Sequence, residues 1–289
     1  MDFDKLHSIW NIFLDAGLVS LQQVLLMSGI FIVFGLLLYV FALGTQIAYL
    51  AILDYKWLLY TTGWIGTPIH ELSHALMCIP FLHRIDEIKL FIPNSEDGTL
   101  GYVSHAYNHR SLWAQVGNFF IALGPVIGGS AILFLMIKYM LPTGNEVLSI
   151  ITLDNATEQG WHQIWESLKQ MVKMMPSVVA TLFAVENLIC WKFWVFLYVG
   201  ICISAHMCLS LADLKGAWHG IYVMFVTFLV VNFLSRQYEF ISSDWIWNIC
   251  VLPQKLIGIF MLSTIVSAMN CVLTILILSI IRFIRNRKG

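Results

Sequence analysis

Residues 57–82 read WLLYTTGWIGTPIHELSHALMCIPFL, and Glu71 is the only Asp, Glu, Lys or Arg among them. About 20 apolar residues suffice for a helix to cross the ~30 Å hydrocarbon layer of a bilayer. The stretch therefore predicts a membrane-crossing helix that carries one acid. A carboxylate at membrane depth costs about 2.5–3.5 kcal/mol on insertion scales, so Glu71 is expected to have a partner or a task.

The rest of the chain has the same apolar character. Of 289 residues, 59% are hydrophobic and 11% are charged, which excludes an ordinary soluble domain, a disordered chain and a coiled coil. A net charge of -1 means that the chain has no excess of basic residues to bind phosphates, so nucleic acid is excluded as a partner. Further runs without Asp, Glu, Lys or Arg cover 16–53, 111–137, 193–212, 216–235 and 256–281. Each run is long enough to cross a bilayer.

We predict an all-α polytopic membrane protein with about six transmembrane helices and a small membrane-associated β-hairpin. In the hairpin, two β-leaning stretches at 85–92 and 99–104 flank the turn-rich PNSEDG. The stretch ALGPVIGG in the third span consists largely of small residues, which favours a close helix neighbour. The predicted spans are 23–48, 57–82, 112–139, 193–211, 217–234 and 255–281.

The predicted organisation has four parts. Residues 1–22 form an N-terminal interfacial amphipathic segment, 23–56 hold the first span, 57–220 form a catalytic core, and 221–289 hold the remaining spans and a basic tail. The core includes the hairpin at 85–104 and an extracytoplasmic insert at 142–191. Six crossings put both termini on one side, and the positive-inside rule makes that side cytoplasmic. We expect a multi-pass protein of a bacterial or archaeal cell membrane. The basic residues of the tail are Arg282, Arg285, Arg287 and Lys288.

His70-Glu71-Leu72-Ser73-His74 matches the pattern H-E-x-x-H. Residues four apart on a helix differ by about 40° around its axis, so both imidazoles can reach one zinc ion while Glu71 faces the bound water. Zinc lowers the pKa of that water toward ~7, and the glutamate then acts as general base and acid. Thr67-Pro68 resembles an N-cap with proline at the first helical position, which predicts a kink just before the motif.

A catalytic zinc ion normally takes three protein ligands, and Asp213 is the leading candidate for the third. In the predicted topology it lies at the cytoplasmic end of the fourth span, at the depth of the motif. The alternative is an interfacial aspartate that ends a helix and pairs with Lys215. Glu186 is a second candidate ligand, but the topology puts it on the opposite side of the membrane from the motif.

HELSHA in a membrane helix, a hairpin after it, a span with ALGPVIGG and an acidic motif that ends a later span resemble the site-2 protease family of intramembrane zinc metalloproteases. The resemblance covers about 57–220 and is that of a divergent member. Where the family has L-D-G after an Asn-Pro-containing stretch, this chain has SAHMCLSLADLKGA, without Asn-Pro and with Leu-Lys between Asp213 and Gly216.

The resemblance implies a zinc endopeptidase that cleaves a peptide bond in or near a transmembrane segment of a membrane-protein substrate. By that resemblance His70, His74 and Asp213 hold one catalytic Zn²⁺, and Glu71 is the catalytic residue. It also implies that the hairpin receives the substrate as an added strand, which replaces the backbone hydrogen bonds that a transmembrane helix loses when it unwinds.

Two other functions remain open at this point. Some membrane zinc transporters place H-E-x-x-H in a membrane helix, although such carriers need a second metal-binding motif and usually more spans. A protease-like protein that only binds membrane helices would have no need of both histidines and Glu71.

Four further polar residues near the motif are interpreted as structural. His206 is expected to be a hydrogen-bonded core histidine, although it lies seven residues before Asp213, close enough in sequence to approach the metal. His105 and His109 are expected in a solvated loop after the hairpin; the alternative is that they reach the site. Asn118 is expected to hydrogen-bond between helices; the alternative is that it helps to position substrate.

Overall fold

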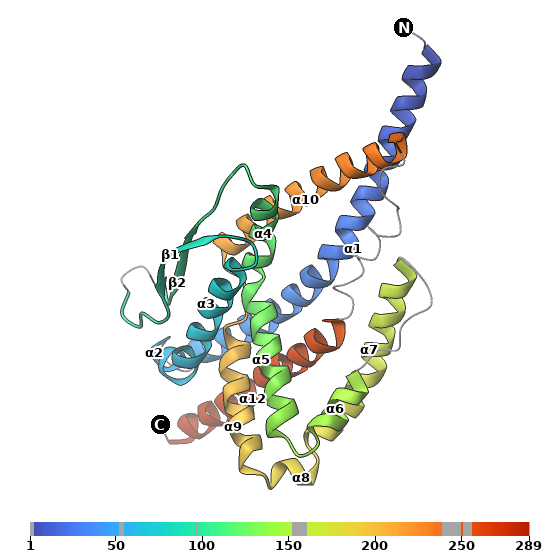
Figure 1. Cartoon of the computed structure of the whole chain (residues 1–289). Coiled ribbons are helices and arrows are strands. Elements are labelled where there is room, and N and C mark those ends of the chain that lie inside the picture. The colour runs from blue at the N-terminus through green and yellow to red at the C-terminus, as the bar shows by residue number, and fades with distance from the viewer. Residues whose placement is uncertain are drawn as a thin grey trace.

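The computed structural model describes residues 3–51, 55–95, 98–151, 161–238, 250 and 256–288. The first two residues of the predicted interfacial segment, residues 152–160 of the predicted insert and the first residue of the predicted sixth span lie outside these ranges. The described chain is mostly helical and contains a small two-stranded antiparallel sheet (Figure 1). The predicted combination of helices and a hairpin is thus confirmed.

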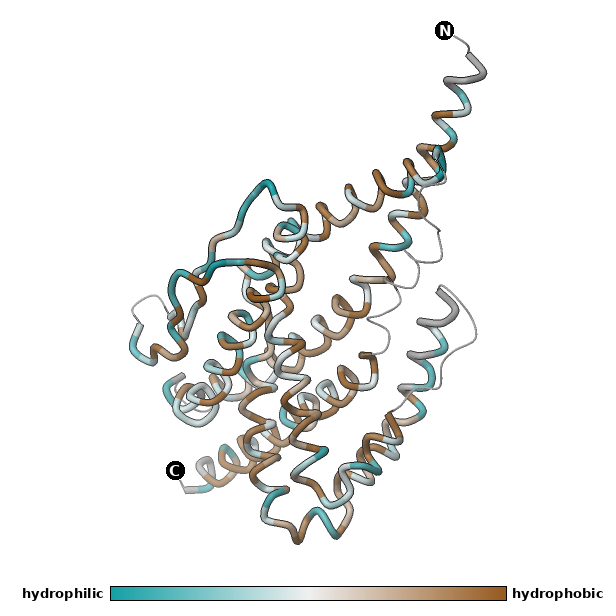
Figure 2. Tube along the Cα trace, in the orientation of Figure 1, coloured by the Kyte–Doolittle hydropathy of each residue, from teal (hydrophilic) through white to brown (hydrophobic). Residues whose placement is uncertain are grey.

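Among the described residues, three helices are long and apolar enough to cross a membrane by length and composition: His7–Leu50 within α1 (Phe3–Leu50), all of α10 (Leu211–Tyr238), and Ile257–Ile284 within α12 (Ile257–Lys288). Figure 2 shows hydrophobic residues along most of these helices and hydrophilic residues gathered at the hairpin and the connection that follows it. A fourth candidate span is a bent pair, α4 (Leu112–Ala122) and α5 (Gly124–Met140), whose axes differ by 58°.

The other two predicted spans are not among these candidates. The H-E-x-x-H motif lies in α3 (Trp64–Cys78), and the predicted fourth span corresponds to α9 (Trp191–Ala205); each helix has 15 residues. At 1.5 Å per residue, each extends only about 22 Å. The structure therefore contains three or four candidate spans, and the count of six stays a prediction.

The N-terminal segment and the predicted first span form one helix. α1 passes through the expected boundary at 22 and 23 without a break, and its N-terminal end projects beyond the rest of the molecule (Figure 1). Further along, α1 packs against α10 and α12. Four buried phenylalanines, Phe31 and Phe34 of α1, Phe119 of α4 and Phe260 of α12, lie in the resulting core.

The predicted helix start at Thr67-Pro68 is wrong. α3 begins at Trp64, and Pro68 lies inside it. Proline has no N–H and its ring clashes with the carbonyl four residues earlier, here that of Trp64, so the distortion falls on the preceding turn. A π-helical turn, η1 (Leu59–Gly63), connects α2 (Tyr55–Leu58) to α3 and ends before the turn at 64–67.

The hairpin follows α3 after a tight turn. Strand β1 (Arg84–Lys89) pairs antiparallel with β2 (Tyr102–Ala106), and a bulge between Ile85 and Glu87 leaves Asp86 without an opposite residue. Beyond α5, the chain continues through α6 (Gly144–Ile151), α7 (Trp161–Leu182) and α8 (Val185–Leu188) before it enters α9. The stretch WHQIWESLKQMVKMM of the predicted insert lies in α7.

Candidate metal centre

The motif helix α3 is enclosed by other helices. It packs against α4, α5 and α9. A β-carbon on Gly124 would lie 2.9 Å from the carbonyl oxygen of Ser73, so a larger residue there would push α5 away from α3. The close neighbour that the small residues of ALGPVIGG predicted is therefore the motif helix itself.

Both motif histidines are oriented by backbone carbonyls. Nδ1 of His70 lies 2.6 Å from the carbonyl oxygen of His206, and Nδ1 of His74 lies 2.7 Å from that of Ile121. A carbonyl oxygen can only accept a hydrogen bond, so each Nδ1 carries the hydrogen. In the neutral imidazole this leaves a lone pair on each Nε2, which is the arrangement usual for histidines that bind metals.

The two Nε2 atoms meet a carboxylate oxygen. They lie 3.2 Å from each other, and Nε2 of His74 lies 3.3 Å from Oδ1 of Asp213. The three potential ligand atoms are all within 4.8 Å of one another. Three electron-pair donors at this separation need positive charge between them, and two imidazole nitrogens with one carboxylate oxygen form a donor set that suits zinc. The structure thus brings together His70, His74 and Asp213, as the sequence predicted.

Asp213 is held in place by a capping box at the start of α10. The backbone N–H of Ser210 donates to Oδ2 of Asp213 at 2.7 Å, and the backbone N–H of Asp213 donates to Oγ of Ser210 at 3.1 Å. These reciprocal bonds satisfy two backbone donors that a helix start otherwise leaves unpaired. One carboxylate oxygen therefore fixes the helix start while the other faces His74.

The predicted position of Asp213 at the end of the fourth span is wrong. α9 already ends at Ala205, residues 206–210 form an irregular connection, and Asp213 lies in the first turn of α10. The reading of Asp213 as a helix-ending residue fails for the same reason. The missed signal is Ser210-Leu-Ala-Asp213, a serine followed three residues later by an acid, which marks a helix start.

Glu71 lies beside this cluster and is only 7% exposed. It lines a cavity of about 630 Å³ between α3, β2, α4 and the start of α10. A β-carbon on Gly101 would lie 2.8 Å from Cγ and 3.1 Å from Oε1 of Glu71, so the backbone just before β2 runs directly against the glutamate. Sequence reasoning missed Gly101, because only the folded hairpin brings it to the motif. The cavity is lined by His70, Glu71, His74, Thr99, Gly101, Tyr102, Val103, His105, Asn118, Ile121, Ala122, Ser210, Leu211, Ala212, Asp213 and Gly216.

His206 contributes to the site through its backbone carbonyl, which orients His70. It caps the C-terminus of α9, its carbonyl accepts from His70, and its ring lies 3.2 Å from Oγ1 of Thr62. The interpretation as a hydrogen-bonded core histidine agrees with these contacts. Glu186 precedes α9 whereas His206 follows it, so the length of that helix, about 22 Å, separates Glu186 from the cluster. The structure does not bring Glu186 to the motif.

Two residues that were expected elsewhere line the cavity. Asn118 was expected to bond between helices, but its amide donates to the carbonyl of Gln115 within α4. His105 was expected in a solvated loop. This expectation is wrong, because His105 belongs to β2 and faces the cavity that contains Glu71.

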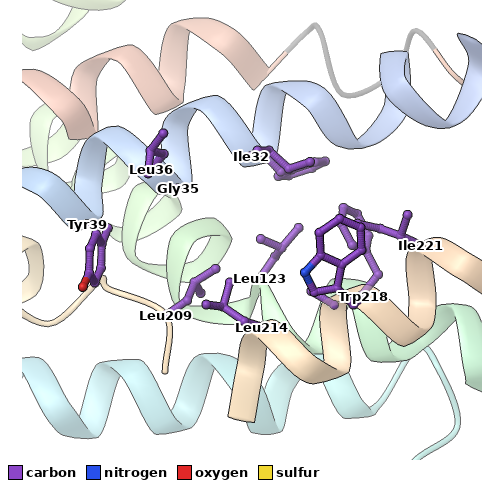
Figure 3. A pocket seen from close by; sticks show the side chains of 12 residues that line it. Ile32, Gly35, Leu36, Tyr39, Leu123, Leu209, Leu214, Trp218 and Ile221 are labelled. Carbon is purple, nitrogen blue, oxygen red and sulfur yellow. The ribbon is translucent and has the colours of Figure 1, made fainter. Parts of the chain in front are cut away.

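A second, almost entirely apolar groove of about 410 Å³ lies between α1, α4 and α10. In Figure 3, Ile32, Leu36 and Tyr39 of α1 face Leu214 and Trp218 of α10 across it. The first two turns of α10 therefore border the groove and also carry Asp213.

Comparisons of the chain with protein-family models, with curated proteins and with solved structures gave no match.

Proposed function

We propose that this protein is an intramembrane zinc metalloendopeptidase of the site-2 protease kind, which cleaves a peptide bond in or near a transmembrane segment of a membrane protein. One observation carries the proposal: the Nε2 lone pairs of His70 and His74 and a carboxylate oxygen of Asp213 converge beside Glu71. This constellation combines the three ligands of a catalytic zinc ion with a candidate general base.

Each residue of the site would have a separate role. When bound, zinc supplies a water of lowered pKa and polarises the substrate carbonyl. His70, His74 and Asp213 would hold the ion, and the carbonyls of His206 and Ile121 keep both imidazoles in the ligand tautomer. Glu71 would accept a proton from the attacking water and pass it to the leaving amine.

The cavity suits an extended peptide. Five residues of the hairpin segment line it together with Glu71: Thr99, Gly101, Tyr102, Val103 and His105. β1 occupies one edge of β2, and the other edge offers backbone N–H and C=O groups to an added strand. A substrate helix that unwinds in lipid loses its internal hydrogen bonds, and strand addition would replace them.

Mapping new protein N-termini tests the proposal. Wild type and Glu71→Gln are reconstituted with membrane proteins extracted from the expression host, and the termini that appear are identified by mass spectrometry. We expect new termini inside or next to predicted transmembrane segments with wild type only. Glu186→Gln is the matched control, because the same change far from the cluster should leave cleavage intact. Equal sets of termini with wild type and Glu71→Gln would refute the proposed peptidase.

A further inference from the structure

A strained turn brings His83 against His105 of the hairpin. The chain leaves α3 through Leu82, whose φ of 59° lies in the left-handed region. The N–H of His83 bonds the carbonyl of Cys78 and the N–H of Leu82 bonds that of Ile79, which together form a Schellman motif with a leucine where glycine is usual. The left-handed conformation is unfavourable for a non-glycine residue, and such strain persists where the surroundings fix it.

His83 and His105 form a hydrogen-bonded chain with one direction. Nε2 of His83 lies 2.8 Å from the carbonyl oxygen of Ala114, so this nitrogen must carry a hydrogen and donate it. Nδ1 of a neutral His83 is then an acceptor. It lies 2.9 Å from Nδ1 of His105, which must therefore be the donor. In a neutral His105 this leaves a lone pair on Nε2.

The neutral form of both rings is favoured by their surroundings. Burial lowers the pKa of His105, the neighbouring His83 and His74 lower it further, and Asp86 opposes them. Burial also lowers the pKa of His83, and its bond to Ala114 opposes this shift. Tyr107 stacks on the ring of His83 with centroids 4.6 Å apart, which fixes the plane of that ring. His105 thus presents an acceptor, and the residue lines the cavity that contains Glu71.

We propose that His105 is a substrate-binding residue whose Nε2 accepts a hydrogen bond from a main-chain N–H of the peptide in the cavity. The inference rests on the proposed function and adds to it a contact from the second strand. A peptide that turns its scissile carbonyl toward the zinc ligands leaves the pairing with β2 at that point. Its next N–H groups then need an acceptor, because a buried donor without a partner is unfavourable.

A hydroxamate-capped, fluorescein-labelled Ala-Leu-Ala-Leu peptide is the probe, and its Kd is measured on zinc-loaded protein. His105→Phe removes donor and acceptor and should weaken binding by roughly 5- to 150-fold, because the peptide N–H is left buried without an acceptor. His105→Gln is the matched variant, because its amide can donate to His83 and accept from the peptide, and its Kd should stay within about 2-fold of wild type. Thermal unfolding of each variant verifies that it is folded.

A second probe is N-methylated at its backbone amides. It should bind wild type more weakly than the parent probe and show a smaller loss on His105→Phe, which is the coupling expected of two groups in contact. Nitrogen-15 NMR of histidine-labelled protein should show Nδ1 of His105 protonated and Nε2 unprotonated.

Three results would each overturn the assignment: equal Kd values for wild type and His105→Phe, absence of probe binding, or a proton on Nε2 of His105. Probe binding that depends on His105 in a protein that cleaves nothing would refute the peptidase and leave the binding role of His105 intact.

Discussion

Nε2 of His74 lies 3.3 Å from Oδ1 of Asp213, although the histidine belongs to α3 and the aspartate to α10. The other oxygen of the same carboxylate accepts from the backbone of Ser210. One side chain thus joins the start of a candidate transmembrane helix to the motif helix. The two tasks of Asp213 can be separated by substitution.

Asp213→Asn should lower zinc affinity and leave the fold intact. The amide keeps an oxygen for the helix cap but loses the negative charge, so the loss should exceed the roughly 10- to 100-fold that removal of an outer-shell partner typically causes. Zinc competition with a chromophoric chelator measures the affinity. Ser210→Ala is the complementary control: it should lower the free energy of unfolding by about 1 kcal/mol and keep one zinc per chain. Normal zinc affinity in Asp213→Asn would remove Asp213 from the ligand set.

Glu71→Gln should retain zinc and lose cleavage. Glutamine preserves the shape of the side chain but cannot accept the proton, and general base catalysis typically contributes about 10²- to 10⁴-fold. Elemental analysis measures the metal content. The turnover of a substrate found by terminus mapping measures the cleavage activity. A zinc flux into sealed vesicles that survives this substitution, from a wild type that cleaves nothing, would instead indicate a transporter.

Gly101→Ala should lower activity by roughly 10- to 100-fold, because its β-carbon would lie 2.8 Å from both Cγ of Glu71 and the carbonyl oxygen of Lys89, so the glutamate or the strand beside it must shift, and small displacements in a catalytic site cost about this much. Zinc content should not change, because Gly101 approaches the glutamate and not the ligand atoms. Gly29→Ala is the control, since a β-carbon there meets no atom within 4 Å. Full activity of Gly101→Ala would show that the hairpin does not hold Glu71 in place.

Leu82→Gly should raise the free energy of unfolding by about 1 kcal/mol. Glycine adopts the left-handed conformation without a β-carbon penalty, and the leucine side chain is 74% exposed, so little burial is lost. Unfolding in detergent micelles provides the measurement. Leu82→Ala keeps the β-carbon and should bring no such gain. Equal stabilisation by alanine would attribute the effect to the side chain and not to the backbone.

The hairpin should lose stability as the pH falls below about 6.5, the ordinary pKa of histidine. The folded state lowers the pKa of His83 and His105. Below this pH the unfolded state therefore binds more protons and is stabilised relative to the folded state. Hydrogen exchange of residues 84–106 at pH 7 and pH 5 reports the change. His83→Gln cannot take up this proton, so its exchange should depend less on pH. An unaltered pH dependence in that variant would exclude His83 as a source.

The sequence predicted the parts of the site that follow from local spacing. His70 and His74 share a helix face because they are four residues apart, and turn residues between two β-leaning stretches were enough to predict the hairpin. The break between the fourth and fifth predicted spans was misplaced because Ser210 and Asp213 stand among apolar residues that hydropathy alone cannot divide. The cavity positions of Gly101 and His105 depend on how the hairpin folds back over α3, which no local pattern reports.

The π-helical turn at Leu59–Gly63 holds one residue more than an α-helical turn at the same place would. A π turn closes its hydrogen bonds over five residues where an α turn uses four, so it stores one extra residue ahead of Trp64. Losing one residue there would convert the turn to regular helix and leave the angular positions of His70 and His74 unchanged. Deletion of one residue would therefore be tolerated on the N-terminal side of the motif. Between the two histidines, which three residues separate, no such tolerance exists.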